Sequence, residues 1–234
     1  MLEVKNISAY YGDAQALEDV SLSLPAHGVT AFLGPNAAGK STTLRVISGL
    51  IPAATGTIEF EGRDITRTPP QERVAMGIVH VPEGRRLFNT MTVEDNLILG
   101  GYTQRKDRKT TERLNEIYDH FPKLAERRKQ EAGLMSGGEQ QMCAVGRGLM
   151  AGPKVLMIDE MSLGLAPVIV KQMFGIVKDI AATGMSVLLV EQHVKNALDV
   201  ADFGTIIDGG ITRASGPAAE LRESDVVRES YLGH

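Results

Sequence analysis

Apolar and polar residues alternate along the first part of the chain, from Leu2 to Leu24, with a polar break at Gly12 and Asp13. A period of two places successive side chains on opposite faces of a strand, so this pattern predicts antiparallel strands with one face toward solvent. The next segment, Val29–Leu33, is mostly apolar and leads at once into a glycine. Such a short run is typical of a strand buried at the centre of a sheet.

Further along the chain, short apolar runs alternate with longer segments of helical period. Strands are predicted at Thr57–Phe60, Ile78–Val81, Val155–Ile158 and Val187–Val190. Helices are predicted at Ser41–Leu50, Val168–Ala182 and Lys195–Val200. Because strands this apolar have no polar face to expose, their alternation with helices predicts a parallel sheet that is covered on both faces.

One charged stretch interrupts this alternation. Between Thr92 and Ala132 the sequence has a helical period, and Thr92 with Glu94 supplies a signal for a helix N-terminus. We expect residues from approximately 85 to 150 to form a helical insertion in a single domain that spans residues 1–234. The final segment, Ala218–His234, is mildly amphipathic and too short for a further regulatory domain.

The composition narrows the class of protein. With 234 residues and 43% hydrophobic content, the chain is long enough for one well-buried domain and short for two. A net charge of −4 and the lack of tryptophan argue against a nucleic-acid-binding protein. The single Cys143 favours a reducing compartment, with the cytoplasm as the default. The sequence shows no signal peptide and no apolar run near the roughly 20 residues that span a bilayer, so any membrane association is expected to come through partners.

A glycine-rich segment, Gly34–Ser41, lies between a predicted strand and a predicted helix. It satisfies the P-loop pattern, in which backbone N–H groups converge on phosphate and the following helix adds its positive end. Lys40 would reach the outer phosphates, and the Ser41 hydroxyl would bind Mg²⁺. The alternative, a glycine-rich turn without a ligand, is disfavoured by the strand and helix context. Ligand contacts are therefore expected at Asn36, Ala37, Ala38, Gly39, Lys40, Ser41 and Thr42.

A second element of phosphate chemistry is the pair Asp159 and Glu160, at the exit of the apolar strand Val155–Ile158. Asp159 can hold Mg²⁺ directly or through water, and Glu160 can polarise an attacking water as a general base. On its own such a carboxylate pair is usually a solvated loop. Together with the upstream P-loop it indicates phosphoryl transfer, since that chemistry needs both parts.

Between these two elements, Ser136, Gly137, Gly138 and Glu139 stand at the predicted start of a helix. With this segment the chain resembles the ABC ATPases, whose signature is Ser-Gly-Gly followed by polar residues that open a helix. Two glycines at a helix N-terminus form a second anion site, the alternative being an ordinary N-cap with a glycine turn. The resemblance implies the α/β P-loop fold of the ABC ATPases: a mostly parallel core sheet flanked by helices, an N-terminal antiparallel β subdomain and an α-helical insertion.

The resemblance also implies ligands and partners. In the family two subunits pair head to tail, so that the signature of one closes over the ATP at the P-loop of the other. ATP and Mg²⁺ are the expected ligands. The expected partners are membrane permease subunits, a second ABC ATPase subunit that is either identical or a paralogue, and, indirectly, a substrate-binding protein, which would place the chain on the inner face of the cell membrane. Tyr11 matches the aromatic residue that stacks on adenine, although an aromatic there could equally pack within a strand.

Several positions depart from the commonest family pattern. Glu83 stands where most members have a glutamine that senses Mg²⁺ and the membrane partner. Gln192 aligns with the histidine that senses the γ-phosphate, and His193 lies one residue beyond it, so both remain candidates. A glutamine can donate a hydrogen bond to phosphate but carries no positive charge. Ala37 replaces a frequent P-loop glycine, which matters if that position requires a positive φ.

The string Val81–Phe88 looks like that of the ATPase subunits of branched-chain amino acid importers, among which Glu83 and Gln192 are ordinary. The resemblance implies an ATPase that powers the import of such amino acids. Arg85, Arg86 and Phe88 would offer anchors for a cytoplasmic helix of a permease, the alternative being a solvated basic turn.

Competing functions remain open. One is the ATPase of a related urea, amide or other ABC transporter, since the chain holds no pocket for the cargo. A soluble ABC protein that acts on ribosomes or DNA would usually have a second ABC domain or long arms, and this chain has neither. A P-loop kinase or GTPase would leave the Ser-Gly-Gly segment unexplained and lacks a visible guanine-reading motif.

Overall fold

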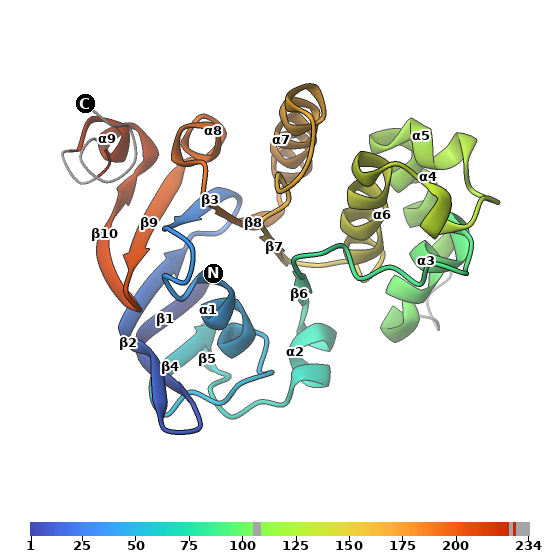
Figure 1. The fold of residues 1–234 in the computed structure, drawn as a ribbon. Helices are drawn as coiled ribbons and strands as arrows, with labels where there is room; N and C mark the ends of the chain where they lie inside the picture. Colours follow the sequence, from blue (N-terminus) through green and yellow to red (C-terminus); the bar gives the residue numbers. More distant parts are fainter. Residues whose placement is uncertain (105–108, 225–226, 228–234) are drawn as a thin grey trace.

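The computed structural model describes residues 1–104, 109–224 and 227, and in this part of the chain two sheets organise the fold (Figure 1). The first is antiparallel, with strand order β2-β1-β4-β5. Its strands are β1 (Leu2–Tyr11), β2 (Ala14–Leu24), β4 (Thr55–Phe60) and β5 (Arg63–Asp64). The polar break between β1 and β2 is the predicted turn at Gly12 and Asp13.

The second sheet has the strand order β10-β9-β3-β8-β7-β6, and it is parallel except for β10 at its edge. Its strands are β3 (Gly28–Leu33), β6 (Ile78–Val81), β7 (Val155–Asp159), β8 (Ser186–Glu191), β9 (Phe203–Asp208) and β10 (Ile211–Pro217). Four of the five short predicted strands are β3, β6, β7 and β8, which lie side by side in this sheet. The fifth, Thr57–Phe60, is β4 of the antiparallel sheet, where it pairs with β1.

The sequence pattern did not predict β9 and β10. Their segment is interrupted by Gly204 and by the Gly209–Gly210 turn. In β10, at the edge of the sheet, every residue is half-buried or exposed, so the strand has no buried apolar face. An edge strand is specified by pairing with its neighbour more than by its own composition. The short helix α2 (Pro70–Met76) was also missed, because about two turns carry little periodic signal.

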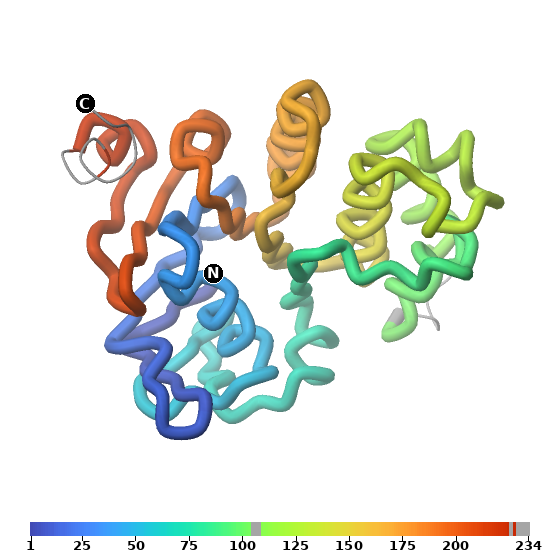
Figure 2. Tube along the Cα trace, in the orientation of Figure 1, coloured from blue at the N-terminus to red at the C-terminus, as the bar shows by residue number. Residues whose placement is uncertain are grey.

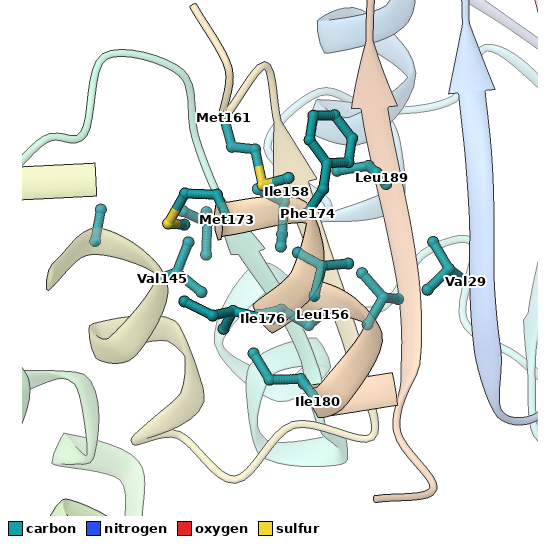
Figure 3. Close-up of a cluster of buried hydrophobic side chains, with 14 of the residues drawn as sticks. Val29, Val145, Leu156, Ile158, Met161, Met173, Phe174, Ile176, Ile180 and Leu189 are labelled. Carbon is teal, nitrogen blue, oxygen red and sulfur yellow. The ribbon is translucent and has the colours of Figure 1, made fainter. Parts of the chain in front are cut away.

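Two hydrophobic clusters cover the two faces of the parallel sheet. Helix α1 (Lys40–Ile47) lies in the cluster that joins one face to the antiparallel sheet. Helix α7 (Pro167–Ala182) packs on the opposite face, where Met173, Phe174 and Ile176 meet Leu156 and Ile158 of β7 (Figure 3). The α8 helix (Val194–Leu198) follows α7 in this layer, and the α9 helix (Ala218–Glu223) lies beside α8.

The described residues between β6 and β7 form a helical lobe to one side of the sheets (Figure 2). Its helices are α3 (Val93–Gly100), α4 (Thr110–His120), α5 (Pro122–Glu126) and α6 (Gly137–Leu149). They fall within the range from 85 to 150 that the sequence predicts for an insertion. Thr92 is the N-cap of α3: its hydroxyl oxygen accepts a hydrogen bond from the backbone N–H of Asp95, and the hydroxyl donates to the Asp95 carboxylate. The acidic residue that joins Thr92 in this cap is therefore Asp95, one position after Glu94.

Within the described residues, the helices all fall short of the length or the apolar character that crossing a bilayer requires.

Candidate functional site

The carboxyl ends of four neighbouring parallel strands define one edge of the core sheet. The P-loop follows β3, Glu83 follows β6, Asp159 ends β7, and Gln192 follows β8. Because all four strands run in the same direction, these residues meet at the same edge. In open α/β sheets this edge is where ligands bind.

Lys40 is the first residue of α1 and is almost completely buried, with 4% of its surface exposed. Its ammonium group donates to the carbonyl oxygens of Gly34 and Pro35, at 2.8 and 2.9 Å. It also lies 3.2 Å from a carboxylate oxygen of Glu160. The P-loop thus wraps around its own lysine, and α1 directs its N-terminal end at the same space.

Glu160 lies between Lys40 and the end of β8. One carboxylate oxygen pairs with Lys40, and the other accepts a hydrogen bond from the side-chain amide of Gln192. His193 instead occupies the N-cap position of α8 and lines a neighbouring cavity between the Ser162–Pro167 loop, α7 and α8, which Glu160 and Gln192 also line. Of the two candidates, the structure brings Gln192 to Glu160 and the P-loop.

Asp159 has the environment of a cation ligand. Burial raises its pKa to about 6, the nearby Glu160 and Glu83 carboxylates add to the rise, and Ser41 and Lys40 oppose it. Its Oδ1 atom is buried and has no hydrogen-bond partner among the described residues. Such an orphaned carboxylate oxygen is costly unless something positive or donating reaches it.

These groups fit Mg²⁺ in the way that nucleotide-dependent enzymes hold it. Across residues 1–104, 109–224 and 227, no three His, Cys, Asp or Glu side chains form a cluster that would hold a metal by themselves. Mg²⁺ is usually held by one or two carboxylates together with substrate phosphates and water. Ser41, Asp159 and Glu83 supply a hydroxyl and carboxylates of this kind.

An open cavity of about 800 Å³ lies over the P-loop. Glu83, Glu160, Gln192, the Gly209–Gly210 turn and the predicted P-loop contacts from Asn36 to Thr42 line it. Tyr11 ends β1 close by, with its hydroxyl 3.5 Å from that of Thr42 and 2.9 Å from a guanidinium nitrogen of Arg45. Its side chain is 46% exposed, so it is not packed within the strand core.

The Ser136 segment forms a complete capping box at the start of α6. Ser136 accepts from the Glu139 backbone N–H, and a Glu139 carboxylate oxygen accepts from the Ser136 N–H at 2.9 Å. Gly137 and Gly138 belong to the first helical turn, and a Cβ on Gly138 would lie 2.8 Å from Ile169 of α7. None of these four residues lines the cavity over the P-loop of the same chain.

Residues 17–162 match the family described as ABC transporter. A branched-chain amino acid transport ATP-binding protein of Pseudomonas aeruginosa, BraG, is 42% identical over all of both chains. A probable protein of the same description from Archaeoglobus fulgidus, LivF, is 35% identical over all of this chain and 99% of its own.

The chain belongs to the ABC transporter family.

Among solved structures, the ADP conformation of an ATP-binding cassette of an ABC transporter superposes with a TM-score of 0.87 at 30% identity. It covers 100% of this chain and 99% of its own. The predicted family, the P-loop ABC ATPase fold and the ATPase activity are confirmed. The chain is an ATP-binding subunit of an ABC transporter.

Two features of this ABC ATPase escaped the sequence analysis. The Gly209–Gly210 turn between β9 and β10 lines the nucleotide cavity, and the Gly210 N–H donates to the carbonyl oxygen of Ala38. A glycine pair between two apolar runs is a hairpin signal that could have revealed it. The second is Glu191, whose buried carboxylate binds Ser162 and which no motif singles out.

Ala37 adopts φ = +64°, so the position does require the left-handed conformation. For a residue with a Cβ this region costs roughly 1–2 kcal/mol. Glycine avoids that cost but loses more conformational entropy on folding, which offsets part of the gain in stability. We expect Ala37→Gly to raise the melting temperature of this ABC ATPase by about 2 °C. Thermal unfolding measures the change. Ala38→Gly is the matched control and should lower stability, because buried Ala38 is not among the residues with positive φ.

Proposed function

We propose that the chain acts as one ABC ATPase domain, with residues from approximately 85 to 150 as its helical insertion, that hydrolyses ATP at the P-loop edge of the core sheet. The observation that carries this proposal is the convergence of Lys40, Glu160 and Gln192 in a single set of contacts. A base, a phosphate-binding cation and an amide donor at one point are the parts that phosphoryl transfer to water requires.

Each group has a distinct role. The P-loop amides and Lys40 bind the β- and γ-phosphates once the ammonium releases the carbonyl oxygens of Gly34 and Pro35. Glu160 accepts the proton of the attacking water. Ser41, Asp159 and Glu83 would hold Mg²⁺, which neutralises charge on the phosphates when bound. Tyr11, at the rim of the P-loop and half exposed, stacks on adenine.

Gln192 is the γ-phosphate sensor in this proposal, and His193 occupies the N-cap position of α8. The amide of Gln192 already contacts Glu160 and lines the nucleotide cavity, whereas His193 does not line it. An amide donates without charge, so the sensor is insensitive to pH in the range where a histidine would titrate.

The signature acts on a second nucleotide, in a head-to-tail pair with another ABC ATPase subunit, either identical or a paralogue. Within one chain the Ser136 segment does not line the P-loop cavity. The N–H groups of Gly137 and Gly138 belong to the first turn of α6, where the helix itself supplies no partner. These donors, the Ser136 hydroxyl and the capping carboxylate Glu139 form the half-site that closes over the partner's ATP.

A surface beside the nucleotide cavity presents Phe88 to a membrane subunit. The side chain is 53% exposed, and Asn96 fixes its backbone by accepting from the N–H and donating to the carbonyl oxygen. Arg86, two residues earlier in the chain, is also exposed, while Arg85 turns inward and donates to the side-chain oxygen of Gln140 at 3.1 Å. Exposed aromatic and arginine side chains are typical interface anchors, so Arg86 and Phe88 are the proposed permease contacts.

Two similar proteins support a proposal for the cargo. BraG and LivF are both described as branched-chain amino acid transport ATP-binding proteins, and the similarity to each covers this whole chain. We therefore assign import of branched-chain amino acids, with permease subunits and, indirectly, a substrate-binding protein as partners. With such partners, the proposed location of the chain is the inner face of the cell membrane.

Replacing Ser136 separates the signature role from simple helix capping. Aspartate and asparagine both cap helices well, so neither variant should unfold α6. Aspartate adds a negative charge where the γ-phosphate of the partner would lie, and Ser136→Asp should abolish leucine uptake when it replaces the natural chain in its host. Ser136→Asn should retain most uptake. Equal uptake by the two variants would contradict the proposed composite site, and normal leucine uptake without the chain would contradict the assigned cargo.

A further inference from the structure

Glu160 has an unusual backbone for a residue with a long side chain. Its φ is +47°, in the left-handed region that side chains with a Cβ rarely adopt. Its N–H nevertheless continues the β7–β8 ladder and donates to the carbonyl oxygen of Val190 at 2.9 Å. A backbone of this kind costs about 1–3 kcal/mol and persists only where neighbouring contacts enforce it.

The residues directly after Glu160 supply such contacts. Met161 is completely buried and packs into the cluster under α7, near Phe174 and Leu189 (Figure 3). Ser162 is held at two points by Glu191. The carboxylate accepts from the Ser162 N–H at 3.1 Å and from its hydroxyl at 2.6 Å.

Glu191 is connected to Glu160 in two ways, through the bonds to Ser162 and through its neighbour Gln192. It is the last residue of β8, 1% exposed, and the next residue is Gln192, whose amide contacts Glu160. Burying a carboxylate is costly unless hydrogen bonds satisfy it, and two bonds to one residue two positions beyond the base are a specific arrangement. A core position that only filled space would be served by an apolar side chain.

We infer that Glu191 is a positioning residue for ATP hydrolysis: by clamping Ser162 it holds Glu160 in the left-handed backbone conformation that directs its carboxylate to Lys40 and Gln192. This inference rests on the proposed function of Glu160. In this inference the bonds between Ser162 and Glu191 fix the loop after β7 to β8. Releasing the loop would displace Glu160.

Two substitutions of Glu191 test the clamp. Leucine has a similar volume but cannot accept, so Glu191→Leu should lower kcat for ATP about 10- to 100-fold while KM stays unchanged, because a displaced base slows the chemical step without touching the phosphate contacts. Glutamine can accept from the Ser162 N–H and donate to its hydroxyl, so Glu191→Gln should retain most of kcat. Ser162→Ala combined with Glu191→Leu should lower kcat no further than Glu191→Leu alone.

Thr205→Val is the matched control for stability. It removes a buried hydroxyl of the same sheet that pairs with Ser215 at 2.9 Å and lies in another pair of strands. It should lower the melting temperature and leave kcat unchanged. Wild-type kcat in Glu191→Leu, an equal loss in Glu191→Gln, or a rise in KM that accounts for the loss would each overturn the positioning role.

The natural chain and Glu160→Gln are measured alongside. If the natural chain hydrolyses ATP and Glu160→Gln does not, a normal Glu191→Leu overturns the clamp alone. If Glu160→Gln turns over like the natural chain, the role of Glu160 fails and the clamp with it.

Discussion

Glu160→Gln is expected to slow ATP hydrolysis by roughly 10² or more, the scale of general-base catalysis, while ATP binding stays intact. The substitution keeps the shape of the side chain and removes its ability to accept a proton from water. It also removes a negative charge that lies 3.2 Å from Lys40, so the ammonium becomes more available to phosphate. Binding of a fluorescent ATP analogue and release of phosphate measure the two effects separately.

Glu59→Gln provides the control for Glu160→Gln. Glu59 is on β4 in the antiparallel sheet and pairs with Lys5 at the surface, so it shares the chemistry of the substitution but not the site. It should hydrolyse ATP at the natural rate. If Glu160→Gln did the same, the carboxylate would have no part in the chemical step, and the base would have to be sought elsewhere along the cavity.

The parts of the site that could be predicted from sequence are those that follow directly from strand order. An apolar run followed by Gly34–Ser41, and another followed by Asp159 and Glu160, place both groups at strand ends. In a parallel sheet the carboxyl ends of neighbouring strands lie at the same edge, so these two groups must lie close together. Glu83 and Gln192 also follow strands of this set, but it was the resemblance to the ABC ATPases that singled them out.

The contacts that hold these groups could not be predicted in this way. Glu191 and Ser162 are 29 positions apart, and their hydrogen bonds depend on how the end of β8 is placed relative to the loop after β7. The inward turn of Arg85 similarly depends on the placement of α6, which no local pattern specifies. Tertiary hydrogen bonds of single side chains leave no periodic signal in a sequence.

Arg73 is the second residue whose loss should have a large effect, this time on stability. It is 2% exposed, and its guanidinium donates to the carbonyl oxygens of Val46 and Ile47 at the end of α1, and to those of Thr66 and Thr68. Burial lowers the pKa of this group, yet the cation also complements the negative end of the helix dipole. Arg73 therefore ties the helix that begins with Lys40 to the segment before α2.

Arg73→Met should destabilise the protein by at least about 3 kcal/mol, because several buried carbonyl oxygens lose their donors at roughly 1–3 kcal/mol each. For a chain of this length that corresponds to a fall of roughly 10 °C in melting temperature. Arg67→Met, an exposed arginine of the same segment, should change the free energy of unfolding by less than about 0.5 kcal/mol. Arg73→Lys should fall between the two, since an ammonium keeps the charge but cannot reach carbonyl oxygens in so many directions. Thermal and urea unfolding distinguish these outcomes, and a melting temperature for Arg73→Met equal to that of Arg67→Met would show that α1 holds its place without the guanidinium.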